Sequence, residues 1–186
     1  MTQLDEVFTA IDAANAADPR RDEGAPEALL YGQRMSAEAD ALFPDAPDVL
    51  RIAARGQHIE RWIKPRSSYP EGKAGYLKWR RDLAVHHADR VGGLMREAGY
   101  GDEDIDTVGR MIRKEGIKRD DQVQALEDVI CFTFIRWYFA PFAAKHPPEK
   151  VLDIVQKTAR KMSAEARAKA LETFELPDDL AQAFRA

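Results

Sequence analysis

Apolar residues recur every three or four positions along almost the whole chain, and this spacing constrains the fold more than any other feature of the sequence. A helix with that spacing has one apolar face that can pack against its neighbours. Alternating runs of Val, Ile, Thr and aromatic residues bounded by hairpin turns, which would predict strands, do not occur. The sequence therefore predicts an all-α fold.

Proline, glycine and acidic residues mark the ends of the predicted helices. Residues 63–75 contain two prolines and two glycines without an apolar period, which predicts a loop. Gly99 and Gly101 close the next helix in the way that a left-handed glycine cap does. We expect helices over about residues 4–11, 26–43, 49–61, 76–98, 102–116, 123–142, 149–161, 163–174 and 177–184.

The bulk composition limits the class of protein. With 186 residues and 45% hydrophobic content the chain can bury one full core, so we expect a single domain over residues 1–186. The 28 basic and 32 acidic residues are nearly balanced, so no global field draws the protein to nucleic acid or to an anionic membrane. The single cysteine, Cys131, argues against disulfides and a cysteine metal cluster. Without a signal peptide or an apolar segment of spanning length, we expect a cytoplasmic protein.

Several histidine and acidic residues fall on or beside the predicted helices. Imidazole and carboxylate together suit Fe, Mn, Zn, Ni or Mg, so helices that converged would build a site for a divalent ion. A lone buried histidine is more often a hydrogen-bonded core residue, and a lone aspartate in an apolar helix often caps or pairs with arginine. Both interpretations stay open for His58, the pair His86 and His87, Glu115, and the pair Glu127 and Asp128.

Arginine, hydroxyl and aromatic side chains follow His58 directly. Guanidinium groups bind phosphate or carboxylate through paired hydrogen bonds, and aromatic rings stack on a base. The alternative is a solvated basic loop packed on Trp62 and Trp79. The candidate substrate-binding residues are Arg61, Arg66, Ser67, Tyr69, Tyr76, Trp79 and Arg80.

The order of the histidine and acidic positions resembles the HD-domain superfamily of metal-dependent phosphohydrolases. Those proteins are all-α, and their metal ligands come from successive helices of one bundle. The resemblance implies an HD-like core over about residues 26–145, with the C-terminal helices over about 149–186 packed on it. Carried over by position, it implies that the metal ligands are His58, His87, Glu115 and Asp128.

The chain departs from the HD pattern at two places. Ile59 stands where the superfamily has its own aspartate, and Glu60 is the candidate to replace that carboxylate. The early ligand expected on the second helix falls near Gln33 or Arg34, neither of which is a good metal ligand.

Over nearly its whole length the chain is similar to an uncharacterised family, domain of unknown function 4202. This similarity supports the fold and says almost nothing about the reaction. The motifs that carry it are Arg66-Ser67-Ser68-Tyr69-Pro70, Tyr76-Leu77 with Trp79-Arg80, His87-Ala88, Gly99-Tyr100, Leu126-Glu127-Asp128, and Lys157-Thr158 with Lys161-Met162-Ser163.

These features together lead us to expect a metal-dependent enzyme, a hydrolase of a small phosphorylated or anionic substrate such as a nucleotide. Its cofactor would be a divalent ion, Fe, Mn, Ni, Zn or Mg. The candidate catalytic residues are Glu60, Lys114 and Glu127. The alternatives are a non-catalytic nucleotide- or RNA-binding module and an HD-like di-metal oxygenase. No glycine-rich phosphate loop, nucleophile elbow or HExxH pattern occurs, which argues against P-loop enzymes, serine hydrolases and zincins.

Overall fold

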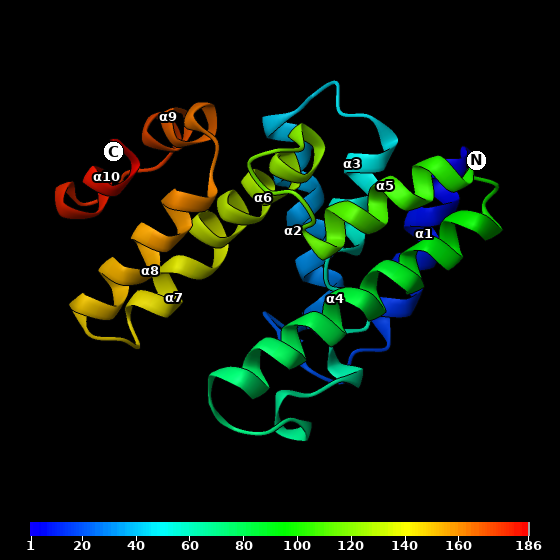
Figure 1. Cartoon of the computed structure of the whole chain (residues 1–186), viewed down its shortest axis with the longest axis horizontal. Coiled ribbons are helices and arrows are strands. Elements are labelled where there is room, and N and C mark those ends of the chain that lie inside the picture. The colour runs from blue at the N-terminus through cyan, green and yellow to red at the C-terminus, as the bar shows by residue number, and fades with distance from the viewer. Residues whose placement is uncertain (186) are drawn as a thin grey trace. The chain divides into compact units, whose positions relative to one another are not determined.

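The structure, a computed structural model, describes residues 1–185 and is almost entirely helical (Figure 1). The all-α prediction is therefore confirmed. The chain divides into two compact units, Met1–Glu115 and Gly116–Ala186. This division does not test the expectation of a single domain over residues 1–186, which stays a prediction. No helix in the described residues is long and apolar enough to cross a membrane.

The first unit contains five α-helices and one short antiparallel hairpin, in which Arg21 pairs with Pro26. Within it α4 packs along α5, and α3 contacts α1, α2 and α5. The elements are α1 (Gln3–Ala16), β1 (Arg21–Asp22), β2 (Ala25–Pro26), α2 (Glu27–Leu42), α3 (Asp48–Gly56), the 3₁₀ turns η1 (Arg61–Ile63) and η2 (Arg66–Ser68), α4 (Gly72–Glu97) and α5 (Asp102–Arg113). Its core includes the fully buried side chains of Val7, Ile11, Met35, Ile52, Ile59, Val91, Met95 and Val108.

The third helix ends earlier than its apolar pattern predicts, at Gly56 instead of about residue 61. The amide of Ile59 donates to the carbonyl of Gly56 at 3.0 Å, which forms a tight turn, and Glu60 adopts a left-handed backbone with φ 51°. Both features end an α-helix. His58 therefore lies in a turn, not on the helix where its pattern placed it.

The long fourth helix begins earlier than predicted, at Gly72 instead of about residue 76. Its first turn packs closely on the preceding loop, because a Cβ added at Gly75 would lie 1.8 Å from the carbonyl oxygen of Pro70. Only glycine permits this approach. The glycines that suggested a loop are thus the residues that let the helix start against it.

The predicted cap after the fourth helix is confirmed. Gly99 has a φ of 89°, and the amide of Tyr100 donates to the carbonyl of Met95 at 3.0 Å. This left-handed closure turns the chain directly into α5.

The second unit contains the remaining helices. The predicted helix over 123–142 is present, with a π-helical segment between its two α-helical parts. The elements are α6 (Asp121–Thr133), the π-helix η3 (Phe134–Tyr138), α7 (Phe139–Ala143), α8 (Pro148–Lys161), α9 (Ala164–Thr173) and α10 (Asp178–Arg185). Its core includes Leu126, Phe132, Met162 and Ala170.

Candidate functional site

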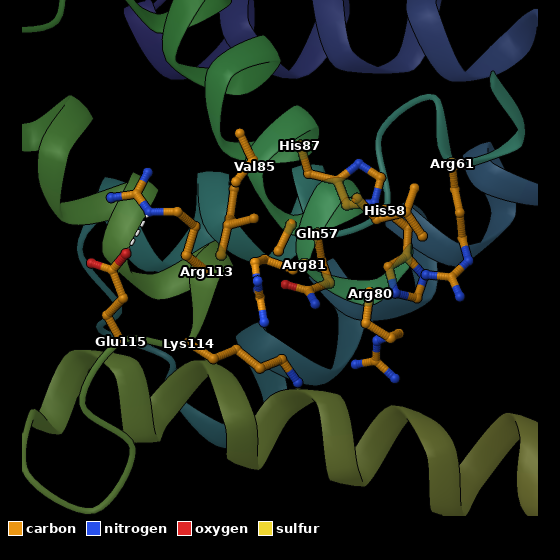
Figure 2. Close-up of a pocket in the computed structure, with 13 residues that line it drawn as sticks. Gln57, His58, Arg61, Arg80, Arg81, Val85, His87, Arg113, Lys114 and Glu115 are labelled. Atoms are coloured by element: carbon orange, nitrogen blue, oxygen red, sulfur yellow. Dashed lines mark hydrogen bonds and ion pairs between the residues drawn. The ribbon is translucent and has the colours of Figure 1, made fainter. Parts of the chain in front are cut away.

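A pocket of about 470 Å³ lies in the first unit, where the turn after α3 meets α4 and the end of α5 (Figure 2). Pockets of roughly 300–1,000 Å³ are the size that small organic ligands occupy. One part of the lining is apolar, with Leu83, Ala84, Val85 and Ile112. The polar lining consists of Gln57, His58, Arg61, Arg80, Arg81, His87, Arg113, Lys114 and Glu115.

Positive charge dominates this lining, with five cationic side chains against the single carboxylate of Glu115. Nε of Arg113 donates to Oε1 of Glu115 at 2.7 Å, and this pair lies to one side of the pocket (Figure 2). Arg80, Arg81 and Lys114 extend toward the same space. Because Arg113 neutralises the carboxylate, Arg61, Arg80 and Arg81 give the pocket a positive potential that favours an anionic ligand.

His58 is held in place by a ring stack. Its imidazole lies on Tyr31 of α2, with the ring centroids 4.1 Å apart and the planes inclined by 16°. Burial lowers the pKa of His58 well below its usual value of 6.5, and the positive charge of Arg61 lowers that pKa further. The imidazole is therefore neutral at neutral pH and can accept a proton.

His87 on α4 lies beside it, with the two ring centroids 5.9 Å apart. It is only 3% exposed, and neither ring nitrogen has a hydrogen-bond partner among the described residues. Burial lowers the pKa of His87 to about 3, and the nearby backbone of Ile59 only partly offsets this shift. A buried polar group without a well-formed hydrogen bond costs about 1–3 kcal/mol, so a ligand in the pocket that hydrogen-bonds to this ring gains affinity from it.

Gln57 is a pocket residue that the sequence analysis missed. Its side chain is 5% exposed, and its Oε1 has no hydrogen-bond partner in the described part of the chain. Figure 2 shows its amide directed toward the same space as Arg81 and Lys114. Its position in the sequence could have indicated this role, because Gln57 is a polar residue that directly follows an apolar helix face and directly precedes His58.

Arg61 and Arg80 were predicted to bind substrate, and both line the pocket. Each also contacts an aromatic ring that was predicted with it. The guanidinium carbon of Arg61 lies 4.9 Å from the centroid of Trp79, and Nη1 of Arg80 donates to the hydroxyl of Tyr76 at 3.1 Å. These contacts fix the direction of two long side chains before a ligand arrives.

The other residues of the predicted substrate-binding loop do not line the pocket. Nη1 of Arg66 donates to the carbonyl of Tyr69 at 3.0 Å, and the Tyr69 hydroxyl donates to Asp82 at 3.0 Å. Ser67 is exposed. The hydrogen bonds of Arg66 and Tyr69 fold the loop onto itself and onto α4.

The candidate catalytic residues of this unit are separated. Lys114 lines the pocket at the left-handed end of α5, with φ 60°. Glu60 does not line it. The Glu60 carboxylate lies 3.4 Å from Nε2 of His86 and 3.2 Å from Nε of Arg90, so it holds two groups of α4.

The acidic pair Glu127 and Asp128 belongs to the second unit. Asp128 accepts hydrogen bonds from the backbone amide of Ser163 at 2.8 Å and from its hydroxyl at 2.7 Å. Ser163 in turn caps α9. Glu127 is 2% exposed, and Nζ of Lys161 lies 4.0 Å from its carboxylate. Asp128 thus joins α6 to the start of α9.

Of the four candidate metal ligands, the pocket brings together His58, His87 and Glu115, but Arg113 holds the Glu115 carboxylate. Among residues 1–185, no three His, Cys, Asp or Glu side chains are grouped so that they could hold a metal ion. The chain residues at the pocket therefore supply two imidazoles within a cationic lining, which is an incomplete donor set. Metal binding stays a prediction.

A model of the family described as Domain of unknown function (DUF4202) matches residues 5–183. The chain belongs to this family. The match spans both units of this DUF4202 member, so the pocket and the Asp128 contact both lie within the family's shared region. Comparison with curated proteins and with solved structures gave no match for this DUF4202 domain.

Proposed function

We propose that this DUF4202 domain is an enzyme that binds a small phosphorylated substrate in the pocket of its first unit and hydrolyses it. The observation that carries the proposal is a cationic pocket that contains two neutral histidines. An HD-like arrangement of the helices and a cytoplasmic location belong to the same proposal.

The cations account for substrate binding. Phosphate is a dianion with several acceptor oxygens, and arginine binds it through two parallel hydrogen bonds. Arg80, Arg81 and Lys114 approach the pocket from two different helices, so they can contact several oxygens of one phosphoryl group. Fixed donors around such a group also stabilise the charge that develops during phosphoryl transfer.

The histidines account for proton transfer. A water molecule attacks phosphorus, His58 takes its proton, and the same proton passes to the oxygen of the departing alcohol, which leaves inorganic phosphate. The negative charge of a bound phosphate raises the pKa of a neighbouring imidazole. The low pKa of His58 in the free protein therefore rises when the substrate binds, which favours proton uptake at that moment.

A divalent ion would be held by His58 and His87, and when bound it would polarise a phosphoryl oxygen. The other two candidate ligands have partners within the chain: Glu115 forms an ion pair with Arg113, and Asp128 accepts a hydrogen bond from Ser163. The hydrolysis described above uses only the side chains of the chain. A metal assay of protein purified without added metal separates the two versions of the mechanism.

The second candidate function is non-catalytic binding of a nucleotide or RNA. It is favoured by Tyr76, which is 42% exposed and is hydrogen-bonded to a pocket arginine. Under this alternative the histidines are structural, and the pocket releases its ligand unchanged.

The test is a release assay for inorganic phosphate with nucleotides and small phosphate esters, with and without Mn, Fe, Ni, Mg or Zn. We expect turnover of at least one ester. His58→Gln should lower kcat strongly, because glutamine cannot take up the proton. Arg80→Lys should raise KM about tenfold, because lysine lacks the planar fork.

Arg96→Lys is the matched control, since Arg96 is an exposed arginine on the same helix and lies outside the pocket. It should leave both constants unchanged. No turnover of any ester, combined with tight binding of a nucleotide, would reject hydrolysis and favour the binding module.

A further inference from the structure

One face of α4 carries both pocket residues and an exposed aromatic ring. Tyr76, Arg80, Ala84 and His87 are spaced by four, four and three positions, so they lie along one side of the helix. Arg80, Ala84 and His87 line the pocket. Tyr76 is therefore placed one helical turn beyond the lining, at the rim.

Arg80 connects the pocket to this ring. Its guanidinium lines the pocket, donates to the Tyr76 hydroxyl at 3.1 Å, and has its central carbon 5.9 Å from the Tyr76 ring centroid. An anionic group bound to Arg80 thus lies next to an aromatic surface. A ligand that extends from that group toward the rim meets Tyr76 first.

Tyr76 differs from Trp79, the other ring at this end of the helix. Nε1 of Trp79 donates to the carbonyl of Lys64 at 2.8 Å, and Arg61 lies over its face, so packing accounts for its position. Tyr76 is 42% exposed. Its hydroxyl accepts a hydrogen bond from Arg80 and its ring centroid lies 5.8 Å from that of Trp79, so the ring is joined to a pocket cation while much of its surface stays exposed.

We propose that the ligand is a nucleoside monophosphate, whose phosphate lies among Arg80, Arg81 and Lys114 and whose base stacks on Tyr76. This rests on the proposed function, because it names the substrate class of the same pocket. A volume of about 470 Å³ exceeds what a lone phosphate fills, and the apolar wall of Ala84 and Val85 suits the carbon atoms of a ribose. Aromatic side chains stack on any base, because every base has a π-face.

The experiment is calorimetric titration of the full chain with AMP and with ribose 5-phosphate, which is AMP without its base. We expect AMP to bind about tenfold more tightly, the difference that one base stacked on an aromatic ring provides. Tyr76→Ala, which also removes the hydroxyl to which Arg80 donates, should bind AMP and ribose 5-phosphate with equal affinity, because the stacking ring is lost. Tyr76→Phe, which keeps the ring, should bind AMP more tightly than ribose 5-phosphate.

Three results would overturn the inference. They are equal affinity of the wild-type protein for the two ligands, AMP binding that Tyr76→Ala does not weaken, and an equal loss for both ligands, which would place Tyr76 with the phosphate. In each of these cases ribose 5-phosphate still binds, so the proposed function stands. If neither ligand binds, the proposed function fails as well. Tight binding of single-stranded RNA without binding of AMP would assign Tyr76 to an RNA surface.

Discussion

His87 links the chemistry of the pocket to the stability of the protein. The pKa of this buried ring is about 3 in the folded state against 6.5 for an unperturbed histidine. Below pH 6.5 the unfolded chain takes up a proton at this position and the folded chain does not, so lowering the pH favours unfolding. Above pH 6.5 both states are neutral, and the position has no pH effect.

We therefore predict that the free energy of unfolding falls as the pH is lowered from 6.5 to 5, by about 1.4 kcal/mol per pH unit for each such histidine. His87→Gln should reduce the slope of unfolding free energy against pH by the contribution of this one histidine. Urea denaturation at several pH values measures both slopes. Leu77→Ala, which changes an exposed side chain of the same helix that carries no titratable group, is the control and should keep the wild-type slope. An unchanged slope in His87→Gln would show that the ring does not resist protonation.

At the scale of single elements, the sequence predicted that helices exist better than it predicted where they end. The apolar period gave the helices of both units, and glycine chemistry gave the cap at Gly99. The end of α3 at Gly56 and the start of α4 at Gly72 were wrong by several residues. The end of α3 depends on the close approach of Gly56 to Val91 of another helix, and the start of α4 on the close approach of Gly75 to the carbonyl of Pro70 in the preceding loop; an apolar period contains neither contact.

Two glycines of α4 give a matched test of this explanation. A Cβ at Gly75 would meet the backbone of Pro70, whereas a Cβ at Gly93 has nothing within 4 Å. Gly75→Ala should lower the free energy of unfolding by about 1–3 kcal/mol, as overpacking does. Gly93→Ala should raise it by about 0.5–1 kcal/mol, because alanine favours helix. Equal effects in urea denaturation would show that the first turn of α4 does not pack on Pro70.

The contact between α6 and α9 tests what Asp128 does. Its carboxylate is buried and accepts both the amide and the hydroxyl of Ser163. Asp128→Ala should cost about 3 kcal/mol of unfolding free energy without any metal present, because these charged hydrogen bonds are lost. Asp153→Ala, which removes an exposed carboxylate on α8, should cost little.

A different result would favour the metal-ligand interpretation of Asp128. In that case Asp128→Ala would be as stable as the wild type in metal-free buffer. Added divalent metal would then stabilise the wild type and not the variant.

At the scale of the whole molecule, the net charge does not indicate the local positive charge of the pocket. A chain of net charge −4 shows no general attraction to anions, yet five cations line one pocket. The resemblance to HD domains implied His58, His87 and Glu115 there, and the basic stretch after His58 suggested Arg61 and Arg80. Gln57 and Arg113 were missed, because the packing of the turn after α3 and of the end of α5 against α4 decides which side chains line the pocket, and a local pattern does not contain that packing.

The measurement that tests the anion-binding pocket most directly is calorimetric titration of the full chain with inorganic phosphate and pyrophosphate. We predict that the wild-type protein binds them, that binding weakens from 0.1 M to 1 M salt, and that Arg80→Gln weakens it about tenfold or more. Arg96→Gln, the exposed control on the same helix, should bind as the wild type does. Equal binding by both variants, or no binding by the wild-type protein, would contradict the assignment of this pocket to a phosphorylated ligand.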